Sequence, residues 1–452
     1  MKSYPNLKET GIDWLGKLPA HWNIRRVKSV ISNTVNGAWG EEPKGDENDL
    51  VCVRVADFDY DKLGISRKNL TTRNIEPSLQ TTRLLDENDL LIEKSGGGDI
   101  WSVGRVVSND LREKSVSSNF IARLVPSREI DSRFLCYVFA AMYAVRLNDR
   151  SIKQTTGIQN LDLYSYLIEK FGFPPLAEQR TIAKFLDNET AHIDSLIAKK
   201  RELIDLLDKK RTSIISHAVT KGLNPKARMK SSGVEWLGDV PEHWDVRRLK
   251  HLLRRGFTNG LFKKKEDFGN GTRLVNVSDI YQADFLIKIN TLERVTATEQ
   301  EVKVFSVQSG DIFFVRSSLK QEGVAASACM LEVPEPTVFE SHVVRARPNS
   351  SLVIPKYLIY YLNSSLARQR LISLSETTTM TTVAQPKLSS LEVAFPSLAE
   401  QHDIVNLIDK RIFDIDELKK QITQSIDLLQ KQRTALISAA VTGKIDVREQ
   451  GN

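Results

Sequence analysis

The sequence predicts an α+β protein in which one long unit, a mixed domain followed by a long helix, occurs twice. Two observations predict this pseudo-two-fold internal repeat. Residues 11–30 match residues 233–252 at 10 of 20 positions, and residues 173–220 match 395–442 at 23 of 48. Both matches have the same offset, which aligns Trp14 with Trp236 and which we call the repeat offset. A repeat of this length is too long for a solenoid, so one polypeptide should carry two similar domains, as a dimer would.

The longer part of each copy, residues 1–172 and 222–394, predicts a globular α+β domain. Short β-branched runs that predict strands alternate with turn signals, whereas 134–147 and 357–371 predict buried helices. The strand-like runs are residues 50–55, 90–92, 274–277 and 312–315. We therefore expect two domains of about 170 residues, which is an ordinary domain size.

The shorter part of each copy, residues 173–221 and 395–452, predicts a long helix and, in the second copy, a tail. Neither Pro nor Gly occurs in 177–220 or 399–442, and prolines just upstream favour a helix start. Apolar residues repeat every seven positions, which is typical of a helix that packs along a partner helix. They are Ile408, Ile415, Ile422, Leu429 and Leu436, with Ile404, Ile412, Leu418 and Ile426 beside them, and Ile193, Leu196, Leu203, Leu207 and Ile214 in the first copy.

Each helix would span about 65 Å at ~1.5 Å per residue. A rod of that length with one apolar stripe needs a partner, and its duplicate is the obvious one. We therefore expect the two helices to form an intramolecular coiled coil. The alternative is a long helix lying on a globular core.

Composition limits the classes of function. The net charge is +7, and the excess lies mainly in residues 221–398, where 24 Lys and Arg face 18 Asp and Glu. Such a balance favours polyanion binding, although many soluble proteins share it. No apolar run suits a signal peptide or a membrane span, and the isolated Cys52, Cys136 and Cys329 predict buried thiols of a reducing compartment. We expect a cytoplasmic protein that does not associate with membranes.

Motifs of the common enzyme classes are absent from the sequence. It has no GxxxxGK[ST] phosphate loop, no GxGxxG after a strand, no HExxH and no GxSxG. The seven histidines are scattered, and His21 and His243 suit packing or capping better than metal binding. The sequence therefore predicts a non-catalytic binding protein that holds neither a metal nor a cofactor.

Two pairs of motifs mark the ends of the repeated parts. W-L-G-x-[LV]-P-x-H-W occurs at 14–22 and 236–244, and F-P-x-L-A-E-Q occurs at 173–179 and 395–401. Both long helices end in R-T and, six residues later, A-V-T. Over nearly the whole chain, this arrangement resembles the specificity subunits of type I restriction–modification systems.

The resemblance implies a subunit that reads a bipartite, asymmetric site in double-stranded DNA. In this family each variable segment is a target-recognition domain for one half-site, and the two conserved helices pack antiparallel and set the spacer. The subunit is a non-catalytic scaffold for two modification (methyltransferase) subunits and, in the larger assembly, two ATP-driven restriction subunits. S-adenosylmethionine, ATP and Mg²⁺ are then expected on the partner subunits. A reader that works with modification subunits alone remains open.

The candidates for DNA contact follow the strands that end at Ile92 and Val315. Basic side chains there could bond to base edges, and serines suit phosphate or either base. They are Lys94, Ser95 and Arg105 in the first domain and Arg316, Ser317, Ser318 and Lys320 in the second. A second pair of loops adds Trp39 and the run Lys263, Lys264 and Lys265, which we expect to meet phosphate. For each residue the alternative is a solvated surface loop.

The copies diverge through 31–172 and 253–394, so we expect a shared scaffold that carries different recognition loops. Two other classes of function remain open. A coiled-coil adaptor that binds proteins would show no sequence-selective, salt-dependent DNA binding. A self-sufficient methyltransferase would need an adenine-flipping NPP[YF] motif, which the sequence lacks.

Overall fold

The structure, a computed structural model, describes residues 2–97, 102–154, 157–377 and 380–448. The chain forms two compact units: unit 1 is Met1–Arg201 with Thr423–Asn452, and unit 2 is Glu202–Ile422. Each unit contains a head, which is everything outside the two long helices, and a part of each long helix. The units therefore cut across the predicted helical segments, and the segment boundaries remain predictions.

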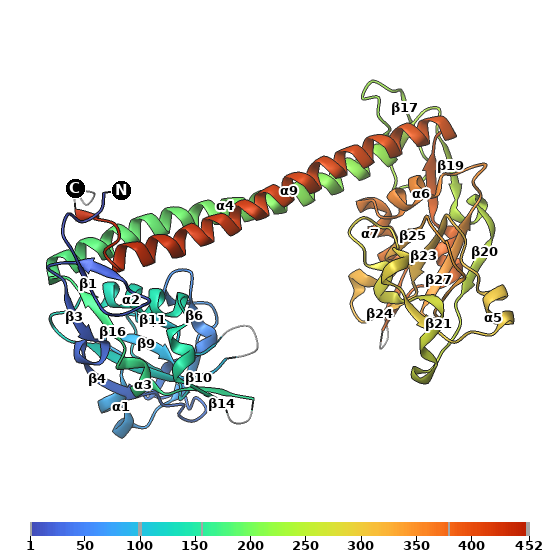
Figure 1. Cartoon of the computed structure of the whole chain (residues 1–452). Coiled ribbons are helices and arrows are strands. Elements are labelled where there is room, and N and C mark those ends of the chain that lie inside the picture. The colour runs from blue at the N-terminus through green and yellow to red at the C-terminus, as the bar shows by residue number, and fades with distance from the viewer. Residues whose placement is uncertain (1, 98–101, 155–156, 378–379, 449–452) are drawn as a thin grey trace. The chain divides into compact units, whose positions relative to one another are not determined.

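The head of unit 1 is built on three small sheets (Figure 1). The central antiparallel sheet has the order β11 (Val106–Ser108), β9 (Leu90–Glu93), β13 (Ile121–Pro126) and β4 (Ile31–Asn36). The second has β12 (Ser115–Ser117), β5 (Asp49–Val53) and β8 (Thr71–Asn74), and the third has β10 (Ser95–Gly96), β15 (Gln159–Leu161) and β14 (Ile152–Gln154). Three pairs complete it: β1 (Leu7–Glu9) with β2 (Lys17–Pro19), β3 (Asn23–Arg26) with β16 (Lys170–Phe173), and β6 (Phe58–Asp59) with β7 (Gly64–Ile65).

The core of unit 1 forms where the central sheet meets a buried helix. Strand β9 is buried along its whole length, as its continuous apolar run predicts. Helix α2 (Ser132–Ala144) packs on the sheet, and its N-terminus is capped by Asp131, which accepts a hydrogen bond from the Phe134 N–H at 2.9 Å. Two short helices, α1 (Pro77–Arg83) and α3 (Leu163–Leu167), complete the head.

The head of unit 2 repeats this topology. Its sheets have the orders β25 (Ser327–Met330), β23 (Asp311–Val315), β27 (Val343–Pro348), β20 (Leu253–Asn259); β26 (Thr337–Phe339), β21 (Phe268–Val275), β22 (Glu293–Val295); and β24 (Ser317–Ser318), β29 (Thr381–Thr382), β28 (Glu376–Thr377). The pairs are β17 (Met229–Ser231) with β18 (Asp239–Pro241) and β19 (Asp245–Arg248) with β30 (Glu392–Phe395). The strands of the two heads thus follow the same orders, and among the strands of the described residues only the β6–β7 pair lacks a counterpart.

The helices of head 2 differ from the prediction at one point. The segment 357–371 forms two helices, α6 (Pro355–Leu362) and α7 (Ser365–Ser373), instead of one. The break falls at Asn363 and Ser364, because the Ser364 hydroxyl caps α7 by accepting from the Ala367 N–H. The remaining helices are α5 (Glu299–Val304) and α8 (Gln385–Ser390).

Both predicted long helices are present, as α4 (Leu176–Lys221) and α9 (Leu398–Val441). In each unit a part of α4 lies beside a part of α9 (Figure 1). Ion pairs join them: Asp194 to Arg433 at 3.0 Å in unit 1, and Asp208 to Lys419 at 2.6 Å and Arg211 to Asp416 at 3.1 Å in unit 2. Within unit 2 the residue numbers rise on α4 as they fall on α9, so the helices run antiparallel there.

The apolar seam differs from the predicted one at two positions. Ile408, Ile415 and Ile422 are buried, but Leu203 and Leu418 are each 42% exposed. Both leucines lie outside the positions that stay on the contact face. In α4 those buried positions include Ile193, Ile197 and Leu207.

The three cysteines are buried and free, as predicted. Burial raises the pKa of the Cys52 thiol to about 11 and that of Cys329 to about 12, so both are protonated at neutral pH. Within the described ranges, none of the helices has the length and apolar character needed to span a membrane.

Candidate nucleic-acid interface

The two repeated motifs contact each other in both units. In unit 1 Glu178, at the start of α4, accepts a hydrogen bond from Trp22 Nε1 at 3.0 Å, and its other oxygen lies 2.7 Å from His21 Nε2. In unit 2 Glu400 makes the same contacts, with Trp244 at 3.1 Å and with His243 Nε2 at 2.7 Å. The W-L-G-x-[LV]-P-x-H-W motif at 14–22 and 236–244, which we call the Trp block, therefore holds each head to the start of a long helix. No cluster of possible metal ligands occurs among the described residues.

The glutamine that follows each of these glutamates fixes a helix of the head. Gln179 Nε2 donates to the Pro174 carbonyl at 2.8 Å, and its Oε1 accepts from the Asp131 N–H at 2.9 Å, just before α2. Gln401 does the same with Pro396 at 2.9 Å and with the Ile354 N–H at 2.8 Å, just before α6. The sequence singled out this motif, but its contacts across the fold became visible only in the structure.

Lys94 and Arg316 occupy equivalent positions after the central strands. The backbone N–H of Lys94 donates to the Phe120 carbonyl at 2.8 Å, and that of Arg316 donates to the His342 carbonyl at 2.8 Å. Lys94 Nζ also donates to Asn36 Oδ1 at 2.8 Å. Burial lowers the pKa of the Lys94 ammonium, and the charge of nearby Arg83 lowers it further. Arg316 is exposed, so each head places a cation at the same point of the fold.

The predicted serines lie in the small third sheets. Ser95 pairs with Asn160, and its Oγ donates to Asn160 Oδ1 at 2.7 Å. Ser317 and Ser318 pair with the strand Thr381–Thr382 in the same way. The glycine-rich stretch after Ser95 continues into residues 98–101, which lie outside the described residues.

The hairpin that completes each third sheet was missed from the sequence. It is β14 with β15 in unit 1 and β28 with β29 in unit 2. Its signal was available, since the polar, Thr-containing stretches 153–160 and 375–382 are related by the repeat offset. Within the described residues, Gln159 and Asn160 lie beside the strand of Ser95, and Thr381 and Thr382 lie beside that of Ser317, so polar side chains from two distant segments meet in each head.

An open hollow of about 750 Å³ lies beside the third sheet of unit 2. It is lined by Ser317, Ser318 and Lys320, together with Val277, Tyr281, Leu319, Glu322, Gly323, His342 and Met380. Lys320 is exposed, and the side chain of Leu319 is 84% exposed. Hydroxyls and a cation beside an apolar surface are the groups that can contact the polar edge and the apolar atoms of a base.

Arg105 is already engaged within the head. Its Nε lies 3.3 Å from Glu93 Oε2, and its guanidinium carbon lies 3.5 Å from the centre of the Tyr60 ring. Glu93 is buried; burial raises its pKa, and the Arg105 charge lowers it. Its contact with DNA remains a prediction.

The candidate residues of the second pair of loops differ in their exposure to solvent. Trp39 is 39% exposed, with the Arg73 guanidinium 4.7 Å from its ring centre. Lys263 is 13% exposed and bonds to Glu301 at 2.9 Å, so its charge is already paired. Lys264 and Lys265 are exposed, and the Lys264 ammonium lies 4.0 Å from the exposed carboxylate of Glu266, so both cations face the solvent.

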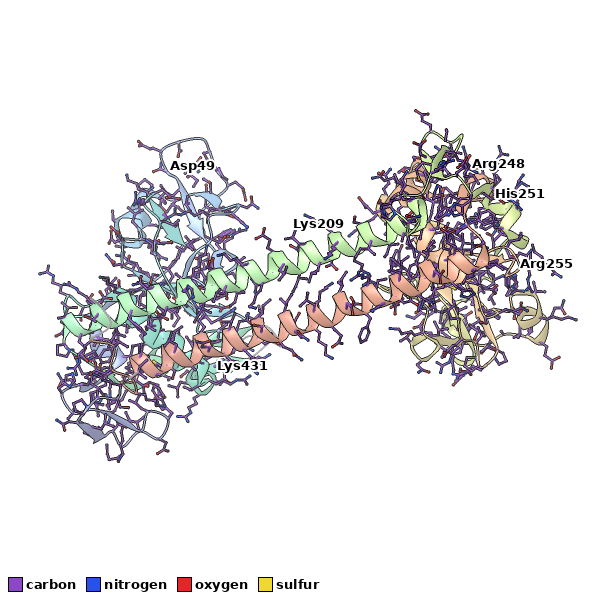
Figure 2. All side chains as sticks on the ribbon, turned by 90° about the horizontal axis from the view of Figure 1, so that it is seen from above. Asp49, Lys209, Arg248, His251, Arg255 and Lys431 are labelled. Carbon is purple, nitrogen blue, oxygen red and sulfur yellow. The ribbon has the colours of Figure 1, made fainter. Side chains whose placement is uncertain are left out.

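A strip of cations in unit 2, which we call the basic strip, was not singled out from the sequence. Arg248, His251 and Arg255 lie on the same side of the unit (Figure 2). The strip comprises Arg248, Lys250, His251, Arg254 and Arg255, all exposed, on β19, β20 and the turn between them. At the repeat offset, unit 1 has Arg26, Lys28, Ser29, Ser32 and Asn33. Unit 2 therefore gains part of its basic excess at this edge.

Comparison with known proteins places both heads in one family. The family model for the type I restriction modification DNA specificity domain matches residues 56–206 and 241–428. The chain is 22% identical over 437 residues to the type I restriction enzyme EcoKI specificity subunit of Escherichia coli K12, covering 95% of this chain and 90% of the relative. It is 24% identical over 441 residues to the MjaVIII specificity subunit of Methanocaldococcus jannaschii, covering 96% and 95%.

Solved structures agree in fold. A chain from a study of complex assembly and conformational transition of the type I R-M system aligns with a TM-score of 0.69 at 15% identity, over 95% of this chain and 99% of that one. The HsdS subunit of Thermoanaerobacter tengcongensis aligns with a TM-score of 0.52 at 16% identity, over 95% and 98%. Because the family model matches well over half of the sequence, twice in succession, the chain belongs to the family of type I restriction–modification DNA specificity proteins.

Proposed function

We propose that this chain is the DNA sequence-specificity subunit of a type I restriction–modification complex. Each head reads one half of a bipartite, asymmetric site in double-stranded DNA, and the chain itself performs no catalysis. The family membership supports the assignment, and the geometry of the two heads supports the division of labour between them.

One observation carries the asymmetric site: equivalent backbone positions hold different side chains. Lys94 corresponds to Arg316, and Phe120 corresponds to His342, with the same backbone hydrogen bond of 2.8 Å in both units. A common backbone with different polar and apolar groups at its surface recognises different bases, because base edges differ in donors, acceptors and methyl groups.

The long helices are proposed as the ruler between the half-sites. An antiparallel, pseudo-two-fold coiled coil of α4 and α9 is supported by ion pairs at equivalent positions, since the repeat offset relates Asp194–Arg433 in unit 1 to Asp416–Arg211 in unit 2. Such a rod resists bending, so its length would determine the number of unread base pairs between the half-sites.

Partners would supply the chemistry. We propose that two modification subunits bind this chain, with two restriction subunits in the full assembly. S-adenosylmethionine, ATP and Mg²⁺ would bind to those partners in the cytoplasm. The exposed surfaces of α4 and α9, with Lys209 and Lys431 as labelled examples (Figure 2), are available for contact with them.

Methylome sequencing tests the proposal. Cells that carry this chain with a modification partner should methylate one bipartite motif that cells without it lack. Exchange of residues 31–172 for the segment of another family member should change one half-site only. The absence of any new methylated motif, together with DNA binding that ignores both salt and sequence, would instead support a protein-binding adaptor.

A further inference from the structure

Arg433 of α9 bonds to both α4 and the head of unit 1. Its Nε lies 3.0 Å from Asp194 Oδ1 on α4, and its Nη2 donates to the backbone carbonyl of Asp61 in the head. The arginine is therefore on one long helix, its carboxylate partner is on the other, and its carbonyl partner is in the head. Its side chain is only 13% exposed.

The same arrangement occurs in unit 2. Arg211 of α4 lies 3.1 Å from Asp416 of α9, and its Nη2 donates to the Ala283 carbonyl of the head at 2.6 Å. Its side chain is 11% exposed. The arginine, the aspartate and the carbonyl residue of the two units are all related by the repeat offset. The carbonyl residue is Asp61 in unit 1 and Ala283 in unit 2, and this change has no effect on the bond because only the backbone carbonyl accepts it. We call each arrangement an arginine clasp.

The turn that each clasp holds has a constrained backbone. In unit 1 the next two carbonyls, of Lys62 and Leu63, each accept from the Arg133 guanidinium of α2 at 3.0 Å. Leu63 has a φ of 51°, and the equivalent Phe285 of unit 2 has a φ of 60°, a left-handed conformation that non-glycine residues rarely adopt. The clasp therefore acts on a turn with a left-handed residue in both units, and in unit 1 this turn is also bonded to helix α2 of the head.

The clasp is far along the helix from the Trp-block contact. The rise of ~1.5 Å per residue places Glu178 and Asp194 about 24 Å apart along α4. One attachment lets a head rotate about that point, whereas two well-separated attachments fix its direction. A tilt of roughly 10° at the far side of a domain about 30 Å across would move a DNA contact by about 5 Å, more than the ~3.4 Å rise of one base pair.

We propose that Arg433 and Arg211 are positioning residues that fix the tilt of each head on the long helices and thereby hold the spacer to a single length. This inference rests on the proposed function, because it concerns the separation of the half-sites. Neither arginine is assigned a contact with DNA.

The test compares arginine and aspartate variants in the full complex with modification subunits. Arg433→Met and Arg211→Met keep an unbranched, mostly aliphatic side chain but donate to neither partner. Asp194→Asn and Asp416→Asn are matched controls, because they remove the helix-to-helix charge and leave the arginine on the head carbonyl. Lys419→Met is a third control, because it removes the ion pair with Asp208, which also joins the two helices. The measurement is the spacer distribution of methylated sites.

We expect both arginine variants to methylate sites whose spacer is one base pair longer or shorter, with unchanged half-sites. The increase should be roughly tenfold over wild type, as expected for the loss of a charge-assisted hydrogen bond. The asparagine variants and Lys419→Met should keep one spacer. A single spacer in both arginine variants, or equal broadening in Lys419→Met, would overturn the inference.

Two further results complete the interpretation. If Arg433→Met yields no folded complex, Arg433→Lys is measured, since lysine lacks the guanidinium fork whose Nε and Nη2 bond separately to Asp194 and to the Asp61 carbonyl; a single spacer there also overturns the inference. A wild-type chain that methylates no bipartite motif would refute the proposed function, whereas a wild-type motif with unchanged spacers in the variants would refute only the clasp.

Discussion

The two units share their backbone framework and differ in the side chains placed on it, including buried ones. The Trp22–Glu178 and Trp244–Glu400 hydrogen bonds measure 3.0 and 3.1 Å. In contrast, the ion pair of Glu93 with Arg105 in unit 1 is replaced by Val315 and Ala326 in unit 2, although the same backbone hydrogen bond measures 2.9 Å in both. The difference shows that the backbone is set by contacts that repeat, and that even a buried side-chain pair can change without altering it.

The largest expected effect tests whether the contacts of Glu178 in unit 1 and of Glu400 in unit 2 contribute equally to stability. Glu178→Ala removes the partner of Trp22, His21 and Tyr4, whereas Glu400→Ala removes that of Trp244 and His243 only. The Glu178 side chain is 9% exposed and that of Glu400 is 27% exposed. Glu178→Ala should lower the free energy of unfolding by about 3 kcal/mol and Glu400→Ala by less, measured by urea unfolding. Equal losses would contradict the burial argument.

The next effect concerns the charged pair that only unit 1 has. Arg105→Ala alone leaves Glu93 buried without its counter-ion and should cost about 2 kcal/mol of stability. Glu93→Val with Arg105→Ala, the unit 2 combination, should cost much less. A double-mutant cycle in thermal unfolding measures the coupling, and additive losses would show that the pair is not coupled.

The stability of the Arg105→Ala variant should depend on pH. Burial raises the pKa of Glu93, and without Arg105 only the hydrogen bonds from the Tyr60 hydroxyl and the Gly97 backbone oppose that rise. When an acid has a higher pKa in the folded state than in the unfolded state, stability rises as the pH falls through the interval between them. Arg105→Ala should therefore recover part of its stability as the pH is lowered below the raised pKa of Glu93. A variant whose deficit stays constant with pH would argue against a charged Glu93.

A smaller effect tests the equivalence of the two cations. Lys94→Ala and Arg316→Ala should each weaken DNA binding by about 1 kcal/mol and relax selectivity in one half-site only. The readout is competition binding with duplexes that vary one half-site at a time. If either variant changed both half-sites, the heads would not read DNA independently.

The smallest effect concerns the Lys run of unit 2. Lys264→Ala and Lys265→Ala should weaken binding to all sequences alike and lower the slope of log K against log[salt] by about 0.9 each. Lys263→Ala is the matched control, because its ammonium is already paired with Glu301. A change in base preference would assign these lysines to readout instead of phosphate contact.

Local patterns predicted much of the fold. Strand β9 and helix α2 are continuous apolar runs, and the long helices lack Pro and Gly, so their identity follows from nearby residues. The break between α6 and α7 was not predicted, because a Ser–Ser step after Asn363 reads as a cap only once the chain has turned there. The exposed Leu203 and Leu418 were misplaced because the sequence does not distinguish an apolar residue beside the contact stripe from one within it.

The sequence predicted where the candidate residues lie along the chain, but it did not predict which residues surround them in the fold. Lys94 and Ser95 stand where the sequence indicated, after β9. Lys263 was expected to be available for phosphate, yet Glu301, 38 residues away, holds it. Ion-pair partners at that separation depend on the tertiary arrangement of the elements, which local sequence patterns do not predict.

The sequence by itself determined that this protein is a duplicated unit with two diverged heads and two long helices, because repeats, helix-breaking residues and motifs are local properties of the chain. Only the tertiary structure decided which charges are free and which are paired, and that Arg433 and Arg211 join both helices to a head. The reason is physical: hydrogen bonds and ion pairs act over a few ångströms in space, between residues that the fold alone brings together.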